Sequence, residues 1–162
     1  MSRVLSLVGV VLGVLGVLGW VRRAVVLVTV EGRSMEPALR HGDRVVVWRR
    51  GVGGLRPADV VVLGPPGAVV EVGGVVRSPV AGLQVKRVVG LPGQVVPAEL
   101  RGVVGSDRVP AGTVLVVSDN RAVGLDSRVW GPYPAGGVVG VVVFRAGAGG
   151  GVRFISGAGS GR

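Results

Sequence analysis

The apolar and charged positions divide the chain into one long apolar segment and a region of shorter apolar runs. Residues 4–21 carry no charge and lie between Arg3 and the pair Arg22 and Arg23. As a helix, this segment would be about 27 Å long, enough to cross the hydrocarbon core of a bilayer. A cleaved signal peptide is the alternative, but the run is long for one and no small-residue cleavage site follows it. The pattern therefore predicts an uncleaved membrane anchor at residues 1–23.

Valine-rich runs separated by Gly, Pro and Asp turns predict strands in the rest of the chain. These runs are residues 24–30, 44–48, 60–63, 83–89, 113–117 and 138–144. Residues 64–82 predict a loose hairpin, and the Gly-rich residues 146–162 predict a flexible tail. We find no heptads, no long amphipathic helices and no internal repeats. The pattern predicts a mainly β domain at residues 24–145.

The charge and composition narrow the possible partners. The net charge is +10, which would suit nucleic acid, yet the basic residues are scattered and only 4% of residues are aromatic. A surface that stacks bases is therefore not expected, and anionic lipid headgroups explain the charge equally well. The chain has no cysteine, and its one histidine, His41, follows Ser34 by seven residues in a predicted turn. We expect no thiol chemistry, no metal or other cofactor, and no catalytic role for His41.

Two residues carry the candidate chemistry. Ser34 lies in a turn between Gly32 and Pro37, and Lys86 is the only lysine among 19 basic residues. A serine in a turn and one remaining lysine are each ordinary features on their own. Lysine differs from arginine, however, because it can lose its proton when it is buried. Together, Ser34 and Lys86 suggest a nucleophile and a base of the Ser-Lys type.

Four short motifs in order resemble the S26 family of type I signal peptidases. They are Ser34-Met35-x-Pro37, Gly42-Asp43-x-x-x-Val47, the run 86–93 that begins Lys-Arg-Val-Val-Gly, and Asp119-Asn120-Arg121 followed by Asp126-Ser127-Arg128. Each motif alone is weak, but four in order at compatible spacing are a strong signal. They cover residues 30–145, nearly all of the chain outside the predicted anchor.

The resemblance implies a signal-peptidase-like antiparallel β domain with one N-terminal transmembrane helix. In such a domain Ser34 would be the nucleophile, Lys86 the general base, and Met35 a substrate-binding residue. The oxyanion site would be formed by the backbone of Ser34 and by the position of Gly32, which is also glycine in many Gram-positive relatives. The residues expected to brace the site are Asp119, Asp126 and Arg128.

Two positions depart from the family pattern. Ser118 replaces a glycine that usually precedes the Asp-Asn-Arg motif, and Gly124 replaces the serine that usually hydrogen-bonds the base lysine. Ser118 and Ser127 are the candidate substitutes for that hydroxyl. On this reading, Gly124→Ser is expected to preserve or raise activity.

The resemblance implies a serine endopeptidase that cleaves signal or leader peptides from exported precursor proteins. It would be a monomer in the plasma membrane, with a single span and its catalytic domain outside the cytoplasm. Similarity to the nickel superoxide dismutase maturation proteases leaves open a narrower role on a single precursor. Gly124 leaves open a catalytically impaired, membrane-anchored domain that binds a partner. A self-cleaving Ser-Lys regulator is not expected, because it would need a DNA-binding segment where the anchor lies.

Overall fold

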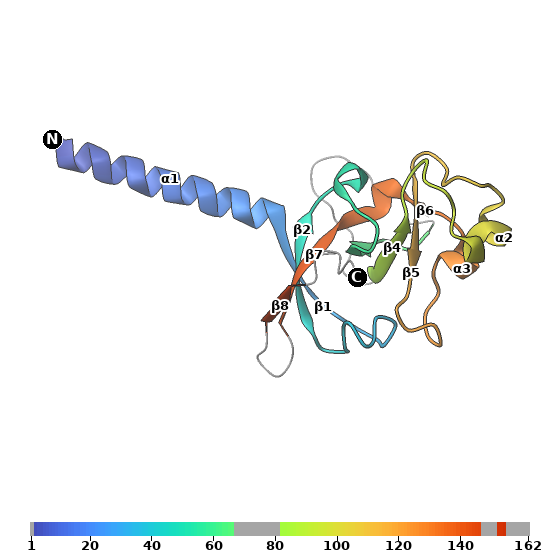
Figure 1. Cartoon of the computed structure of the whole chain (residues 1–162). Helices are drawn as coiled ribbons and strands as arrows, with labels where there is room; N and C mark the ends of the chain where they lie inside the picture. The colour runs from blue at the N-terminus through green and yellow to red at the C-terminus, as the bar shows by residue number, and fades with distance from the viewer. Residues whose placement is uncertain (1, 67–81, 147–151, 155–162) are drawn as a thin grey trace, which may run out of the picture.

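A long helix projects from one side of a β domain in the computed structural model of the chain (Figure 1). The structure describes residues 2–66, 82–146 and 152–154, with side chains for residues 9–66 and 82–146. The helix, α1, spans Ser2–Ala24 and continues directly into the first strand. The β domain contains everything else that the structure describes.

The described side chains of α1 are largely exposed. Leu12, Leu15 and Val17 are among the exposed apolar residues. Near the domain, the Trp20 ring meets the Trp48 ring edge to face, with centroids 5.6 Å apart. Within the part of the chain that the structure describes, no helix combines the length and the apolar character that a membrane span requires.

The described strands form one eight-stranded antiparallel sheet. Their order is β1-β2-β7-β3-β4-β5-β6, with β8 paired to β7. The strands are β1 Val25–Thr29, β2 Arg44–Arg49, β3 Val60–Leu63, β4 Gln84–Gly90, β5 Thr113–Val117, β6 Tyr133–Pro134, β7 Val138–Ala146 and β8 Val152–Phe154. Short helical turns lie between them: η1 Val52–Gly54, η2 Ala98–Leu100, α2 Arg101–Val104, α3 Ser127–Trp130 and η3 Ala135–Gly137.

The central strand β3 supplies side chains to two separate apolar cores. Val60 and Val62 pack into one cluster with residues of β1 and β2, whereas Val61 and Leu63 pack into another with residues of β4 and β5. Successive side chains of a strand point to opposite faces, so the sheet is buried on both sides along this strand. All four residues of β3 are buried as a result.

The prediction of a mainly antiparallel β domain is confirmed, and all six expected strands are present. The short helices and β6 were not predicted, because each is too brief to produce a periodic apolar pattern. Most of the predicted hairpin, residues 67–81, lies outside the described residues. Of the predicted tail, residues 152–154 instead form β8 against β7, and residues 147–151 and 155–162 lie outside the described residues.

Candidate functional site

Ser34 lies on the loop that joins β1 to β2. Two backbone hydrogen bonds close the ends of this loop: Val30 N–H to the Asp43 carbonyl at 2.8 Å and Gly42 N–H to the Val30 carbonyl at 2.9 Å. The Met35 side chain is only 1% exposed and anchors the loop in the core beneath β1. The turn is therefore fixed at its ends and at the residue that follows Ser34.

Gly32 has a positive φ of +88°, a conformation that glycine adopts without steric cost. Its N–H donates a hydrogen bond to His41 Nδ1 at 3.2 Å. The single histidine thus holds the backbone two residues before Ser34.

A second loop, residues 118–126, is hydrogen-bonded to the turn that carries Ser34. The Asn120 backbone N–H donates to the Ser34 carbonyl at 2.9 Å, and its side-chain amide donates to the Arg33 carbonyl at 3.2 Å. Asn120 therefore ties two loops that are about ninety residues apart in the chain. Sequence reasoning did not assign it a role, although it belongs to the Asp119-Asn120-Arg121 motif.

Lys86 lies in β4 and is 4% exposed. Its Nζ donates a hydrogen bond to Ser118 Oγ at 2.8 Å. The β4–β5 register explains this contact: Val88 pairs with Val116 and Arg87 with Val117, so the next step places Ser118 opposite Lys86. Burial lowers the pKa of Lys86, the charge of Asp126 raises it, and the charge of Arg128 lowers it, for a net decrease from 10.5.

Ser34, Lys86 and Ser118 converge on Gly124, which has a φ of +113°. A Cβ placed on Gly124 would lie 3.0 Å from Ser34 Cβ, 3.3 Å from Lys86 Nζ and 2.7 Å from Ser118 Oγ. All three side chains therefore surround Gly124, which has no side chain of its own. The structure contradicts the expectation for Gly124→Ser, because a side chain there would collide with Ser118 and adopt a strained backbone conformation.

Asp126 and Arg128 form an ion pair directly behind Ser118. The Asp126 carboxylate accepts hydrogen bonds from Arg128 Nε at 2.9 Å, from Arg128 Nη2 at 2.5 Å and from the Ser118 N–H at 2.8 Å. It also caps α3 by accepting from the Arg128 N–H at 3.0 Å. Burial alone would raise the pKa of Asp126, but these hydrogen bonds together lower it to about 2.

Asp119 forms an ion pair with Arg87. Its two carboxylate oxygens accept from Arg87 Nε at 2.7 Å and Arg87 Nη2 at 2.6 Å. Arg87 Nη1 also donates to the Ala58 carbonyl at 2.8 Å. Asp119 therefore braces the strand that carries Lys86, and Arg87 is a second site residue that sequence reasoning missed.

A cleft of about 730 Å³ opens beside these residues. One wall is β1 from Leu27 to Val30 and the other is the chain from Gly82 to Lys86, with Ser34, Gly124 and Leu125 also lining the space. Among the described strands β1 pairs only with β2, and β5 pairs only with the later part of β4, Arg87–Gly90. Both walls of the cleft therefore have a free strand edge.

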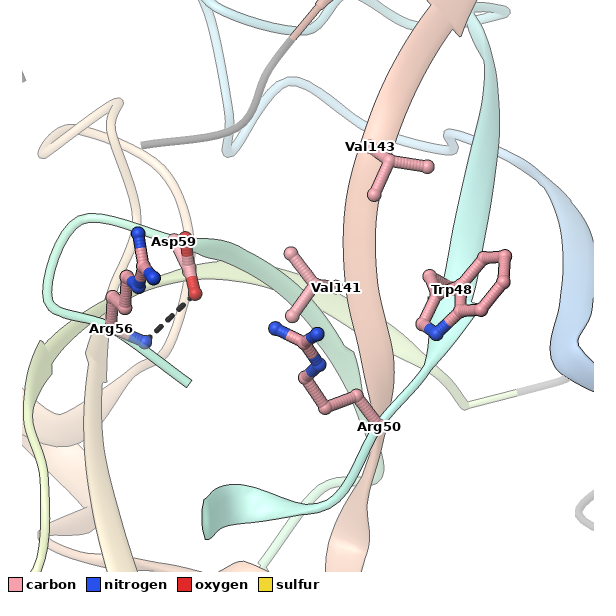
Figure 2. A pocket seen from close by; sticks show the side chains of 6 residues that line it. All are labelled: Trp48, Arg50, Arg56, Asp59, Val141 and Val143. Atoms are coloured by element: carbon pink, nitrogen blue, oxygen red, sulfur yellow. Dashed lines mark hydrogen bonds between the residues drawn. The ribbon is translucent and has the colours of Figure 1, made fainter. Parts of the chain in front are cut away.

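A second hollow of about 320 Å³ lies between β2, β7 and the loop before β3 (Figure 2). Figure 2 shows Trp48, Val141 and Arg50 on one side of it, and Arg56 and Asp59 on the other. The Arg56 backbone N–H donates to the Asp59 carboxylate at 2.8 Å. None of its lining residues is a serine or a lysine, so the cleft beside Ser34 is the candidate active site.

The structure brings together most of the residues that the sequence singled out. Ser34, Lys86, Asp126 and Arg128 lie around Gly124 or directly behind Ser118. Of the two candidate hydroxyls, Ser118 contacts the lysine, whereas Ser127 Oγ accepts from the Val116 N–H at 2.9 Å. Met35, expected to bind substrate, lies in the core and does not line the cleft.

The family model described as "Signal peptidase, peptidase S26" matches residues 2–104 and 97–146. A protein named "Probable signal peptidase I-1" from Synechocystis sp. is 34% identical in an alignment of 134 residues that covers 69% of this chain. The same match covers 66% of that relative, slightly less than two thirds of its length. The chain thus belongs to a family of peptidases. In particular, it belongs to the signal peptidase family, peptidase S26, as its motifs predicted.

The low pKa of Asp126 predicts that the free energy of unfolding depends on pH. Its ionised form is stabilised in the fold, so this contribution is complete above the ordinary pKa of 3.8 and is lost as the pH falls toward about 2. We expect Asp126→Asn to lower the free energy of unfolding at neutral pH by about 2 kcal/mol and to flatten its fall below about pH 4. Denaturant unfolding at several pH values measures both effects.

Asp107→Asn is the matched control, because Asp107 is exposed and makes no described ion pair. It should leave the unfolding curves unchanged. Equal effects of the two substitutions would contradict the role assigned to the Asp126 hydrogen bonds.

Proposed function

We propose that this protein is a membrane-anchored serine endopeptidase that cleaves N-terminal signal or leader peptides from exported precursors with a Ser34–Lys86 dyad. The observation that supports this proposal best is the convergence of Ser34, the Lys86 amine and Ser118 around Gly124. They meet at a cleft with a free strand edge on each side. Family membership supports the same reaction class.

The burial of Lys86 favours its neutral amine, which can act as a base. The amine would take the Ser34 hydroxyl proton as Oγ attacks the scissile carbonyl carbon. When the tetrahedral intermediate collapses, the C–N bond breaks and the lysine ammonium returns the proton to the leaving amine. The neutral amine would then take a proton from water, and the resulting hydroxide would attack the carbonyl carbon of the acyl-Ser34 ester. As the ester C–O bond breaks, the lysine ammonium would return the proton to Ser34 Oγ, and the new carboxyl end would be released.

The Ser34 N–H is the proposed oxyanion donor, because it has no hydrogen-bond partner among the described residues. Gly32 has no side-chain donor, and its N–H is engaged by His41. Its proposed contribution to the oxyanion site is therefore space, which lets the substrate carbonyl approach the backbone closely.

The precursor would bind as an added extended strand between β1 and the chain at residues 83–85. Free strand edges supply backbone hydrogen bonds to such a segment, and alternate side chains enter pockets. Leu27 is 74% exposed on the β1 wall, and Leu83 and Leu125 also line the cleft. This apolar lining suits the apolar segment of a signal peptide.

We propose further that α1 anchors the protein in the plasma membrane as a single span, with the β domain outside the cytoplasm. The charge-free residues 4–21 and the exposed apolar side chains of α1 support an anchor. Trp20 and Trp48 would lie at the headgroup level, where aromatic residues are enriched. The partners would be the lipid bilayer and the precursor, with the enzyme acting as a monomer and without a cofactor.

The alternative of a catalytically impaired, partner-binding domain rested on the missing hydroxyl at Gly124. Because Ser118 supplies a hydroxyl to the lysine, that reason no longer holds. A protease restricted to one precursor uses the same site chemistry and would differ only in the residues of the cleft.

We expect Lys86→Arg to abolish precursor cleavage as completely as Ser34→Ala, because a guanidinium cannot give up its proton near neutral pH. The double variant should be no worse than either single one, since members of one catalytic unit fail together. Wild-type cleavage should rise with pH as the lysine loses its proton. The assay is cleavage of a labelled precursor by the full chain in detergent or membranes. Substantial activity of Lys86→Arg, with none for Ser34→Ala, would refute the dyad.

We expect the full chain to remain in the membrane pellet after alkaline carbonate washing, with its N-terminal residues present. Leu12→Arg combined with Leu15→Arg should release a large fraction, because each arginine at the centre of a span costs about 2.5–3.5 kcal/mol. The control Val103→Arg changes an exposed residue of the β domain and should stay in the pellet. A soluble chain that begins near Ala24 would contradict the anchor.

A further inference from the structure

We propose that Ser118 is the residue that positions Lys86 for catalysis, and that Gly124 is required because its missing side chain leaves room for the Ser118 hydroxyl. This inference rests on the proposed function. It goes beyond it by assigning the lysine-positioning role to the start of the Asp-Asn-Arg segment. The sequence pattern had placed that role six residues later, at Gly124.

The contact between Lys86 and Ser118 is built into the sheet. The two residues face each other across the β4–β5 pair, and both are almost completely buried, at 4% and 2% exposed. Ser118 is the only residue to which the Lys86 amine hydrogen-bonds among those that the structure describes. Water has little access there, so the hydroxyl has no ready replacement.

The backbone of Ser118 is itself fixed. Its N–H donates to the buried Asp126 carboxylate at 2.8 Å, and its carbonyl accepts from Arg128 Nη2 at 3.4 Å. Among the described residues, Asp126 and Arg128 make no hydrogen bond to Ser34 or Lys86. They fix the position of Ser118, and Ser118 contacts Lys86. The ion pair therefore influences the position of Lys86 indirectly, through Ser118.

The hydrogen bond restricts the rotation of the amine. A neutral lysine amine has two N–H groups and one lone pair, and the lone pair must point at the Ser34 hydroxyl to accept its proton. Donation of one N–H to Ser118 leaves only a few orientations for the lone pair. Ser34 Cβ and the Lys86 amine lie 3.0 and 3.3 Å from a Cβ placed on Gly124, so the amine is held in the neighbourhood of the hydroxyl that it has to reach.

Gly124 and Ser118 depend on each other sterically. A Cβ at position 124 would lie 2.7 Å from Ser118 Oγ, which is too short for a carbon–oxygen contact. The hydroxyl would have to rotate away, and the lysine would lose its partner. Substitutions at 118 and 124 should therefore damage the same contact and not two independent ones.

The experiment compares Ser118→Ala, Gly124→Ala and the double variant in precursor cleavage, with Ser34→Ala as the blank. We expect Ser118→Ala to lower kcat by about 10–100-fold with KM changed less than about threefold, because the hydroxyl orients the base and does not line the cleft. The rising limb of the pH–rate profile should move to lower pH, since a hydroxyl that accepts from the amine favours its charged form. The double variant should be no slower than the slower single variant.

Ser127→Ala is the matched control, since Ser127 is also a buried serine, but its hydroxyl bonds to the Val116 N–H and, among the described residues, not to Lys86. It should lower stability without moving the pH profile. A second measurement does not depend on activity. The folded full chain is treated at several pH values with a small reagent that acylates amines, and the acylation of Lys86 is measured by peptide mass spectrometry. This pH dependence should shift to lower pH in Ser118→Ala and not in Ser127→Ala.

The proposal is overturned if Ser118→Ala keeps kcat within about twofold and leaves both pH profiles in place, or if Ser127→Ala shifts them equally. Multiplicative losses in the double variant would show that Gly124 and Ser118 act separately. Absence of Ser34-dependent cleavage by the wild type would refute the proposed function alone, because the acylation profiles would still test the contact between Ser118 and Lys86.

Discussion

The burial of one lysine amine is the constraint on which the rest of the site depends. An ammonium group taken out of water without a counter-ion is costly, and the usual outcome is that the group loses its proton more easily. Lys86 has a hydroxyl as its hydrogen-bond partner and, among the residues that the structure describes, no direct carboxylate partner. A carboxylate in contact with it would favour the charged form and remove its ability to act as a base. Asp126, the acid whose charge raises the pKa of Lys86, is instead paired with Arg128.

A small number of contacts in the surrounding fold keeps Lys86 and Ser34 in place. β3 and β5 flank the lysine strand, and Asp119 pairs with Arg87 next to Lys86. Asn120 hydrogen-bonds the Ser34 turn to the loop that also contains Asp119. Ser34 and Lys86 are therefore both positioned by the same segment of the chain. Gly124 lets that segment pass within contact distance of both. The geometry of the candidate site is therefore a property of residues 118–128 as much as of Ser34 and Lys86.

The strands could be predicted from the sequence, and so could the candidate pair Ser34 and Lys86, because valine runs, a turn serine and a single lysine are local signals. The β4–β5 register could not, since it depends on which strands pair, and it is this register that places Ser118 opposite Lys86. For the same reason Gly124 was interpreted as a lost hydroxyl, whereas in the fold it is the space that another hydroxyl needs. The family resemblance implied that Met35 binds substrate, yet the turn directs its side chain into the core.

The central claim is that Lys86 is poised to be neutral beside Ser34. The chain offers a direct measurement, because Lys86 is its only lysine. Carbon-13 labelling of lysine Cε in the intact protein would give one side-chain resonance, whose chemical shift can be followed against pH by NMR. The account predicts that this resonance titrates with a pKa clearly below the ordinary value of 10.5. A pKa at or above that value would contradict the account, because the lysine would then be charged when the serine has to be activated.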